Sequence, residues 1–329
     1  MSNLNPVSAV AHPNIALIKY WGKRNVQLNL PAAGSLSLTL DGLHTTTSVH
    51  FDPALDHDKI AINDEILSGS KHQRLSEFLD LVRQRAGISH RATVITKNDF
   101  PPSAGLASSA SGFAALALAA SKAANLDLDP TELSILARRG SGSAARSIHG
   151  GWVEMFPGKD DPNGLDSYAV QLHDESHWDL NCLVAVCAQG PKKIGSTEAM
   201  MSTAETAPYY PAWIEDVPKT LVEAKLALAS RDFSKLADVA EASCLRMHAC
   251  AMAANPGILY WKGITVDLIH LVRQMRQEGT PVFFTIDAGP HIKAFCTAEA
   301  APKVSETLAA VPGVQKILHA TPGAGARII

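Results

Sequence analysis

The sequence predicts an α+β fold built from two domains. The chain has 329 residues, which is long for a single hydrophobic core. Segments with strand character gather in the first half, whereas amphipathic helical segments fill much of the second half. Because strands and helices are grouped rather than strictly alternating, an α+β fold is favoured over a doubly wound parallel fold. We place the boundary near residue 190, which gives domains of residues 1–190 and 191–329.

The first half is predicted to consist mainly of strands. Residues 1–12 are expected to form a frayed lead-in, and the apolar segment 14–22 a strand that ends at a glycine. Segments 35–40 and 45–51 alternate with period two around a short Asp-Gly turn, which predicts a hairpin. Further elements are expected as a strand pair at 59–67, an amphipathic helix at 71–86 and a strand at 91–96.

The second half is predicted to be mostly helical, with a few buried strands. Segment 180–187 is continuously apolar, as in a strand that is covered on both faces. The expected helices are 212–230, 232–252, 264–278 and 298–310, and the expected strands are 281–287, 291–295 and 314–319.

Composition indicates an ordinary globular protein, with 46% hydrophobic residues, 19% charged residues and a net charge of −3. This net charge gives no indication of a basic surface that would bind nucleic acid. The five cysteines form no Cys-x-x-Cys pair, which favours unpaired thiols in a reducing cytosol. The N-terminus lacks a signal-peptide pattern, and the longest uncharged run is too rich in alanine, serine, glycine and proline for lipid insertion. We therefore expect a soluble cytoplasmic protein without nucleic-acid or membrane partners.

The segment 101–113 reads Pro-Pro-Ser-Ala-Gly-Leu-Ala-Ser-Ser-Ala-Ser-Gly-Phe and leads into an Ala-rich helix predicted from 106 to 124. Small residues let the backbone pass close to a ligand, and the free N–H groups of a helix start favour an anion. Ser108 and Ser109 would add two hydroxyls, which suits a nucleotide triphosphate and its metal ion. The segment is not a Walker loop. A buried helix whose small residues allow close packing is an equally good interpretation.

A second glycine- and serine-rich segment spans residues 140–151. It follows a helix that is predicted to begin at Asp129 with a capping box and to end at Gly140. Arg146 supplies a fork of donors for a carboxylate or phosphate, and the serines supply hydroxyls. A flexible loop is the alternative, although polar loops between apolar segments often carry function.

Two further groups of residues are candidates for a site. Lys19, Tyr20, Lys23 and Arg24 cluster where the first strand ends and could bind a phosphorylated substrate, although local evidence favours a solvated turn. Asp287 ends an apolar strand beside a Gly-Pro turn, which suits a base or a group that orients a hydroxyl; a turn-forming aspartate is the alternative. The histidines form no metal pattern, so a participating metal would be magnesium bound mainly by phosphate oxygens.

Taken together, these segments resemble the diphosphomevalonate decarboxylase family of the GHMP kinase superfamily. The matching segments occur in the family's order and cover most of the chain: 14–24, 35–39, 105–112, 137–147, 195–197 and 285–290. The resemblance implies a GHMP-kinase-like two-domain fold, with mixed and antiparallel sheets and with helices that form a cleft between the domains. It also implies a homodimer.

The resemblance further implies ATP-dependent decarboxylation of mevalonate 5-diphosphate to isopentenyl diphosphate, with release of ADP, phosphate and CO2, in isoprenoid biosynthesis by the mevalonate pathway. Asp287 would face the 3-hydroxyl, Arg146 would hold the substrate carboxylate and help to set the charge of Asp287, and Asn14 would brace that pair. The substrate would be bound by Tyr20, Lys23, Ser141, Ser143, Arg146 and Ser196. The ATP phosphates would be bound along Gly105, Leu106, Ala107, Ser108 and Ser109, with Mg²⁺ at Ser109.

One segment departs from the family's pattern. Where the family usually has an asparagine-containing stretch, this chain has Ala32-Ala33-Gly34. A polar side chain near the site is therefore missing, which leaves the choice of substrate open. The alternatives are a decarboxylase of mevalonate 5-phosphate, a mevalonate 3-kinase, and a catalytically silent ligand-binding relative.

Overall fold

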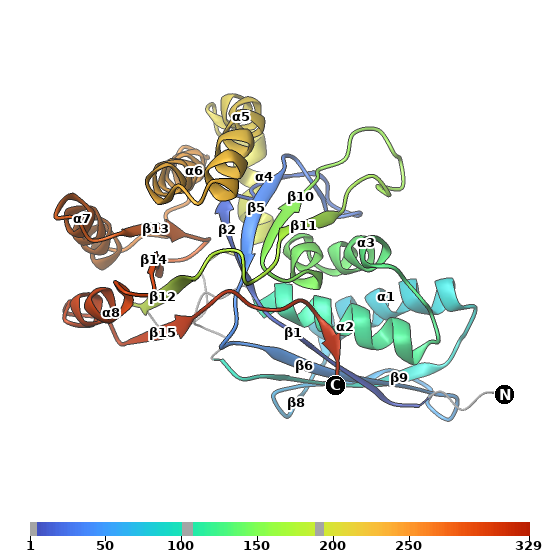
Figure 1. The fold of residues 1–329 in the computed structure, drawn as a ribbon. Coiled ribbons are helices and arrows are strands. Elements are labelled where there is room, and N and C mark those ends of the chain that lie inside the picture. Colours follow the sequence, from blue (N-terminus) through green and yellow to red (C-terminus); the bar gives the residue numbers. More distant parts are fainter. Residues whose placement is uncertain (1–4, 101–107, 188–193) are drawn as a thin grey trace.

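The computed structural model describes residues 5–100, 108–187 and 194–329. Its described strands form one six-stranded sheet, two four-stranded sheets and one two-stranded sheet. Helices cover these sheets in separate groups rather than alternating with each strand (Figure 1). This grouping confirms the α+β prediction, whereas the domain boundary near residue 190 stays a prediction.

The six-stranded sheet has the order β16-β1-β6-β9-β7-β8 and is antiparallel except for the pair β7–β9. The helices α1 and α2 lie on one face of this sheet (Figure 1). The alanines of α2 pack on β1 and β6, because side chains this small let the helix come close to the strands. The elements are β1 (Val7–Ala11), β6 (Thr45–Asp52), β7 (Lys59–Ile62), β8 (Glu65–Ile66), α1 (Gly69–Ala86), β9 (Arg91–Asn98), α2 (Ser108–Ala123) and β16 (Arg327–Ile328).

The first four-stranded sheet has the order β11-β10-β5-β2 and lies between the six-stranded sheet and the second half of the chain (Figure 1). The short pair β3–β4 extends from the end of β2. The elements are β2 (Asn14–Ile18), β3 (Lys23–Asn25), β4 (Leu30–Pro31), β5 (Ser35–Thr39), α3 (Pro130–Gly140), the 3-10 helix η1 (Gly142–Ile148), β10 (Trp152–Met155) and β11 (Ala169–His173).

The second four-stranded sheet has the order β13-β14-β12-β15 and is antiparallel throughout. One face packs mainly against α5 and α6, and the other mainly against α7 and α8 (Figure 1). The elements are β12 (Leu180–Val186), α4 (Ser196–Thr206), α5 (Tyr210–Ala229), α6 (Phe233–Met252), α7 (Gly263–Gln277), β13 (Val282–Ile286), β14 (Ile292–Thr297), α8 (Ala301–Ala309) and β15 (Lys316–Ala320).

The chain passes twice between its two halves. It leaves the first half after β11 and enters the second sheet at β12, and it returns after β15, where β16 pairs with β1. The last strand of the protein therefore belongs to the sheet that contains the first strand.

Several local predictions are confirmed. Asp129 accepts a hydrogen bond from the N–H of Glu132, and the Glu132 side chain accepts one from the N–H of Asp129, which completes the predicted capping box of α3. Asn63 and Asp64 have φ of 50° and 67°, and they form the turn between β7 and β8. The predicted helix at 71–86 and the buried strand at 180–187 are also present as α1 and β12.

Other predictions are wrong. The expected lead-in contains β1, which pairs with both β6 and β16. The hairpin expected from 35–40 and 45–51 does not form, because β5 pairs with β2 and β10 while β6 belongs to the six-stranded sheet. All five residues of β5 are buried, so its alternation did not mark a half-exposed strand. The loop alternative for 140–151 is also wrong, because η1 there is almost entirely buried.

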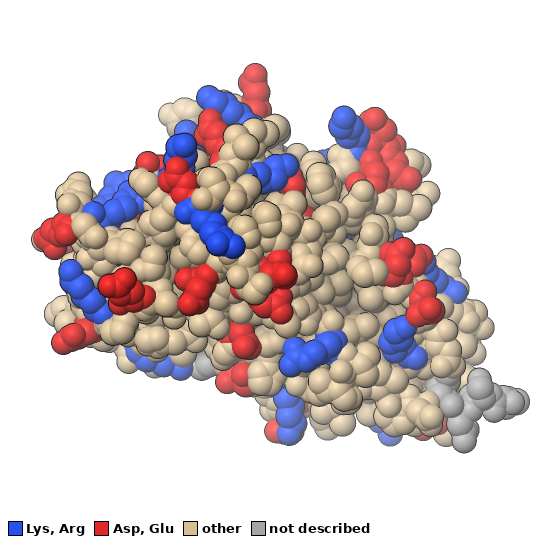
Figure 2. Space-filling view, in the orientation of Figure 1, with Lys and Arg blue, Asp and Glu red and all other residues tan. Residues whose placement is uncertain are grey.

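The surface carries both signs of charge. On the face shown in Figure 2, acidic and basic side chains are interspersed and neither sign covers a continuous area. No helix in the described part of the chain is both long enough and apolar enough to cross a bilayer.

Candidate active site

Asp287 directly follows β13 and lies between two lysines. Lys19 Nζ is 2.7 Å from Asp287 Oδ1, and Lys293 Nζ is 3.3 Å from Oδ2. The two lysine side chains are 2% and 1% exposed, whereas the aspartate side chain is 25% exposed. The carboxylate can therefore meet a ligand from solvent while its two counter-charges stay inside the protein.

The environment of Asp287 keeps its carboxyl group ionised. Burial opposes the charged form, but the nearby charges and hydrogen bonds of Lys19 and Lys293 outweigh it and hold the pKa of Asp287 well below its usual range. At neutral pH the group is a carboxylate, and it can only accept hydrogen bonds. It can orient a hydroxyl group that donates to it.

Lys19 is placed by both halves of the chain. It directly follows β2, and its backbone N–H donates to Ser243 Oγ on α6 at 3.0 Å. Close to this contact, Thr285 Oγ1 on β13 donates to the carbonyl oxygen of Ala16 on β2 at 3.4 Å. Asp287 and its lysines therefore lie where β2 meets the second half of the protein.

Arg146 of η1 is buried and has a fully polar set of partners. Its Nε donates to Asn14 Oδ1 at 3.1 Å and to Ser37 Oγ at 3.0 Å, and its Nη1 donates to Ser35 Oγ at 2.7 Å. Burial lowers the pKa of Arg146 to about 10, and the guanidinium is still charged at neutral pH. None of these partners carries a negative charge, so Arg146 has capacity for an anionic ligand.

Asn14 links the first strand of the site to η1. Its Nδ2 donates to the carbonyl oxygen of Ser143 at 3.0 Å and to Ser147 Oγ at 2.8 Å, while its Oδ1 accepts from Arg146. The amide therefore uses both of its ends to hold the guanidinium against β2. Asn14 braces Arg146 directly, and the contacts of Asp287 come from the lysines instead.

Tyr20 packs against η1 with its hydroxyl inside the protein. The guanidinium of Arg146 lies 5.9 Å from the centre of its ring. A Cβ at Gly142 would lie 2.3 Å from the Tyr20 hydroxyl oxygen, so only glycine leaves room for the ring. The hydroxyl has no hydrogen-bond partner among the described residues, and burial raises its pKa. It therefore stays protonated and is available as a donor.

A chain of three serine hydroxyls joins the start of α2 to η1. Ser141 Oγ donates to Ser109 Oγ at 3.3 Å and lies 3.2 Å from Ser143 Oγ. Ser109 is exposed and Ser108 is half-buried. The structure thus brings these four predicted residues to one place, while Gly105, Leu106 and Ala107 lie outside the described residues.

Lys23 connects the first half of the chain to α4. Its Nζ donates to Asn29 Oδ1 at 2.6 Å and to Thr197 Oγ1 at 3.1 Å. Burial, together with the positive charge of Arg74, lowers the pKa of Lys23 to about 8. Ser196 is the first residue of α4 and directly precedes Thr197, but it makes no hydrogen bond through its side chain within the described ranges.

Further cations surround the end of α3. Arg74 Nη2 donates to the carbonyl oxygen of Gly140 at 2.7 Å, and Asn29 Nδ2 donates to the carbonyl oxygen of Arg139 at 2.7 Å. Arg139 Nε is buried and lacks an acceptor in the part of the chain that the structure describes. A buried donor without an acceptor is costly, and an anionic ligand at this place would satisfy it.

Sequence reasoning missed part of this arrangement. The sequence offers Lys19 only as part of a cluster that binds a phosphorylated substrate or forms a solvated turn, and it predicts no role for Lys293, Ser35 and Ser37. A usable signal existed, because Lys293 interrupts the apolar strand β14 and a charge there must be paired inside the protein. Arg146 was expected to set the charge of Asp287, but the two lysines make its ion pairs and Arg146 interacts with it only at longer range.

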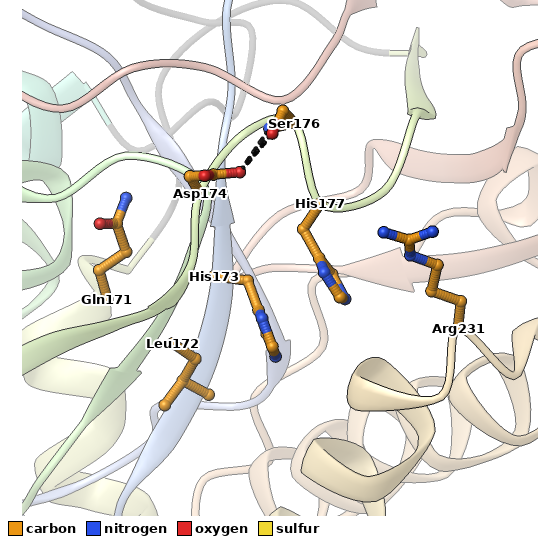
Figure 3. A pocket seen from close by; sticks show the side chains of 7 residues that line it. All are labelled: Gln171, Leu172, His173, Asp174, Ser176, His177 and Arg231. Atoms are coloured by element: carbon orange, nitrogen blue, oxygen red, sulfur yellow. Dashed lines mark hydrogen bonds between the residues drawn. The ribbon is translucent and has the colours of Figure 1, made fainter.

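A separate hollow of about 460 Å³ lies beside β11 (Figure 3). It is lined by Gln171, Leu172, His173, Asp174, Ser176, His177 and Arg231. The rings of His173 and His177 are stacked, with their centres 3.8 Å apart and their planes 13° apart. Lone pairs in two nearly parallel rings cannot point at one ion, so this pair does not form a metal site. The hollow shares no residue with the cluster around Asp287.

The sheets and helices are grouped, and a serine-lined helix start lies beside buried cations and one ionised carboxylate. This fold and this site belong to the GHMP kinase class. The family model of the diphosphomevalonate decarboxylase-like N-terminal domain matches residues 11–169, and that of the mevalonate 5-diphosphate decarboxylase C-terminal domain matches residues 182–325. The chain therefore belongs to the diphosphomevalonate decarboxylase family.

Individual relatives agree with this membership. The diphosphomevalonate decarboxylase of Homo sapiens is 37% identical over 333 residues, covering 94% of this chain and 82% of the relative. The phosphomevalonate decarboxylase of Haloferax volcanii is 33% identical over 303 residues, covering 92% of this chain and 91% of the relative.

Solved structures show the same fold. The crystal structure of mevalonate diphosphate decarboxylase from Staphylococcus aureus has a TM-score of 0.94 and 38% identity and covers 98% of both chains. The structure of MDDEF in complex with MVAPP, AMPPCP and magnesium has a TM-score of 0.93 and 38% identity, also over 98% of both chains.

Proposed function

We propose that the protein catalyses the ATP-dependent decarboxylation of mevalonate 5-diphosphate to isopentenyl diphosphate, with release of ADP, phosphate and CO2. The observation that carries this proposal is the partly exposed, ionised Asp287, held between the buried ammonium groups of Lys19 and Lys293. The family membership, the human relative and the MDDEF complex with MVAPP, AMPPCP and magnesium support it.

The proposed chemistry makes use of this charge arrangement. A tertiary hydroxide is a poor leaving group and phosphate is a good one, so phosphorylation of the 3-hydroxyl prepares the loss of CO2. Asp287 accepts the hydrogen bond of that hydroxyl and orients its oxygen for phosphoryl transfer. Arg146, held by Asn14, pairs with the substrate carboxylate. The fixed cations Lys19, Arg146 and Lys293 stabilise the negative charge that develops as the carboxylate electrons expel phosphate.

The diphosphate of the substrate is assigned to the polar groups around η1. Tyr20 offers a buried hydroxyl donor and Lys23 an ammonium group. Ser141 and Ser143 offer hydroxyls on the adjoining turn, and Ser196 lies at the start of α4. Phosphate oxygens accept several hydrogen bonds each, so a site made of donors suits a diphosphate.

The residues at the start of α2 fit ATP and Mg²⁺. Ser108 and Ser109 stand at a helix N-terminus, and the unsatisfied donor of Arg139 and the guanidinium of Arg74 lie near the same turn. We assign Ser109 to Mg²⁺, and Ser108 with Gly105, Leu106 and Ala107 to the ATP phosphates. When bound, ATP supplies the phosphoryl group and Mg²⁺ neutralises phosphate charge.

A second candidate function is decarboxylation of mevalonate 5-phosphate. Two observations favour it: the Haloferax volcanii phosphomevalonate decarboxylase covers nearly the whole chain, and the segment Ala32-Ala33-Gly34 carries no polar side chain. A Cβ at Gly34 would lie 2.7 Å from Leu221 Cδ1, and Ala33 is buried. This segment therefore packs against α5 and offers no side-chain hydrogen bond to a ligand.

The test is an assay of mevalonate, mevalonate 5-phosphate and mevalonate 5-diphosphate, each with ATP and Mg²⁺, with every product identified. We expect ADP, phosphate, CO2 and isopentenyl diphosphate in equal amounts from the diphosphate. Efficient turnover of the monophosphate alone would favour the second candidate. Accumulation of ADP with a stable 3-phosphate would indicate a kinase, and the decarboxylase proposal would be wrong.

We also propose that the enzyme works as a cytoplasmic homodimer. The homodimer rests on the family resemblance, and gel filtration with light scattering tests it. A monomer at working concentrations would contradict this part of the proposal without affecting the assignment of the reaction.

A further inference from the structure

Lys293 lies on β14, on the face of the sheet that is turned toward β2. It is paired across the strands with Thr285 of β13, whose hydroxyl contacts Ala16 of β2. Side chains of residues that face each other across two strands lie on the same side of the sheet. This register carries Lys293 Nζ to within 3.3 Å of Asp287 Oδ2.

A lysine at this position is costly for the fold. Its side chain is 1% exposed, and a buried ammonium group loses several kcal/mol of hydration that only pairing restores. Asp287 already has Lys19 at 2.7 Å, and Arg146 adds a third buried cation nearby. Three cations face one carboxylate, so the four groups together carry two net positive charges. An apolar residue like the neighbours Ile292 and Ala294 would suit the strand better.

We propose that Lys293 is a positioning residue for the reaction, and that it holds the Asp287 carboxylate ionised and fixed in orientation against the 3-hydroxyl of the substrate. The inference rests on the proposed function. In the phosphoryl-transfer step, the bond from the 3-oxygen to the γ-phosphorus forms as the bond to ADP breaks. The hydroxyl proton leaves toward Asp287 during that step and not before it. The excess positive charge is then matched by the substrate carboxylate and the transferred phosphoryl group.

The neutral titratable groups that the structure describes around Asp287 do not replace the charge of Lys293. Burial and the charge of Lys19 lower the pKa of His248 on α6 to about 3, so its ring is neutral in the working range. Burial raises the pKa of Cys244 on α6 and of Cys182 on β12, so both thiols stay protonated. Among the described residues, the charged groups that act on Asp287 are Lys19 after β2, Lys293 of β14 and, at longer range, Arg146 of η1.

The direct test is to titrate Asp287 in the full-length protein with and without the Lys293 charge. Lys293→Met keeps the length and the apolar stem. In protein labelled with ¹³C at the aspartate carboxyl carbons, the Asp287 signal is identified by its loss in Asp287→Asn. Removing one adjacent cation raises a carboxylate pKa by about 1–3 units. We therefore expect the midpoint to rise by about 1–3 pH units in Lys293→Met; an unchanged midpoint would overturn the inference.

The kinetic test uses the pH profile of kcat/KM, because its limbs report ionisations of the free enzyme, the state that the ¹³C titration also follows. With Asp287 protonating at higher pH, the acid limb of the Lys293→Met profile is expected to move upward by the same amount. Misplacement of the carboxylate is expected to lower kcat by up to about 10²-fold, with a smaller change in KM. Lys293→Arg retains the charge and is expected to restore the low acid limb in part. An acid limb that stays in place would also contradict the inference.

Lys225→Met is the matched control. Lys225 Nζ lies 3.0 Å from both oxygens of the buried Glu154, outside the site, so its loss also removes a cation from a buried carboxylate. This variant is expected to lower the melting temperature without moving the Asp287 signal or the acid limb. Lys293→Gln replaces Lys293→Met if the latter fails to fold. If the unsubstituted enzyme does not turn over mevalonate 5-diphosphate, the proposed function fails, while the ¹³C titration still decides the role of Lys293.

Discussion

Asp58 and Asp287 are both carboxylates held by buried cations, but their surroundings differ. Asp58 has a side chain that is 0% exposed; it binds both terminal nitrogens of Arg83 at 3.0 and 3.1 Å and accepts from Ser76 and from the N–H of Ala92. Asp287 is 25% exposed and faces more positive charge than it can balance. The closed pair at Asp58, whose charges balance, stabilises the contact between a helix and a strand. The open cluster at Asp287, which has excess positive charge, is suited to binding an anionic ligand.

The largest expected effect separates the two carboxylates by activity. Asp287→Asn removes the charge that orients the 3-hydroxyl, so kcat is expected to fall by about 10²–10⁴. Binding of a non-hydrolysable ATP analogue, measured by calorimetry, is expected to change little, because Asp287 is not assigned to the nucleotide. Turnover equal to that of the unsubstituted enzyme would remove Asp287 from the mechanism and break the comparison.

The reverse result is expected for Asp58→Asn. It removes the buried partner of Arg83, which keeps Asp80 Oδ1 at 2.7 Å, so the expected loss of unfolding free energy is about 1–3 kcal/mol. Urea unfolding measures this loss, and kcat per folded enzyme is expected to stay the same. A loss below about 1 kcal/mol would mean that Asp58 does not stabilise the contact between α1 and β9.

The dependence on pH sharpens the same contrast. Burial opposes ionisation of Asp58, but hydrogen bonds from Arg83, Ser76 and Ala92 lower its pKa below the ordinary value. Its contribution to stability is therefore complete above the unfolded-state pKa of about 3.9 and is lost as pH falls through the folded-state value. The difference in unfolding free energy between the unsubstituted protein and Asp58→Asn should shrink below about pH 4. A difference that grows as pH falls would contradict this sign.

The smallest expected effect concerns the packing of the site. Gly142→Ala places a Cβ 2.3 Å from the Tyr20 hydroxyl oxygen, so the ring must shift, at a cost of about 1–3 kcal/mol. KM for the mevalonate substrate is expected to rise more than kcat falls. Gly263→Ala on α7 is the control, because a Cβ there meets no atom within 4 Å and its effect on stability should stay within about 1 kcal/mol. Equal effects of both variants would show that the close approach at Tyr20 is unimportant.

The sequence predicted best those elements whose signals are local. The capping box at Asp129 and Glu132 determines where α3 begins, and the turn at Asn63-Asp64 determines the pairing of β7 with β8. The partners of β5 and β6 could not be predicted, because pairing across sheets depends on tertiary contacts that alternation does not encode.

The candidate site shows the same limit. Asp287 and Arg146 were marked by their neighbours in sequence, and the structure places both near the junction of β2 with the second half of the chain. Lys293 was missed because its partner became apparent only when β13, β14 and β2 came together. The sequence signal for Lys293 was a single charged residue within an apolar strand. Such a residue indicates that a buried partner exists but does not identify that partner.

The return of β16 to the sheet of β1 has a mechanical consequence. The two halves are joined by the peptide chain at two places, before β12 and after β15, and Asp287 lies where they meet. A single tether would let one half swing in any direction, but two tethers must bend together. Because Lys19 belongs to one half and Asp287 to the other, the two tethers and the hydrogen bonds of Lys19 and Thr285 across the junction keep the carboxylate and its lysines in register.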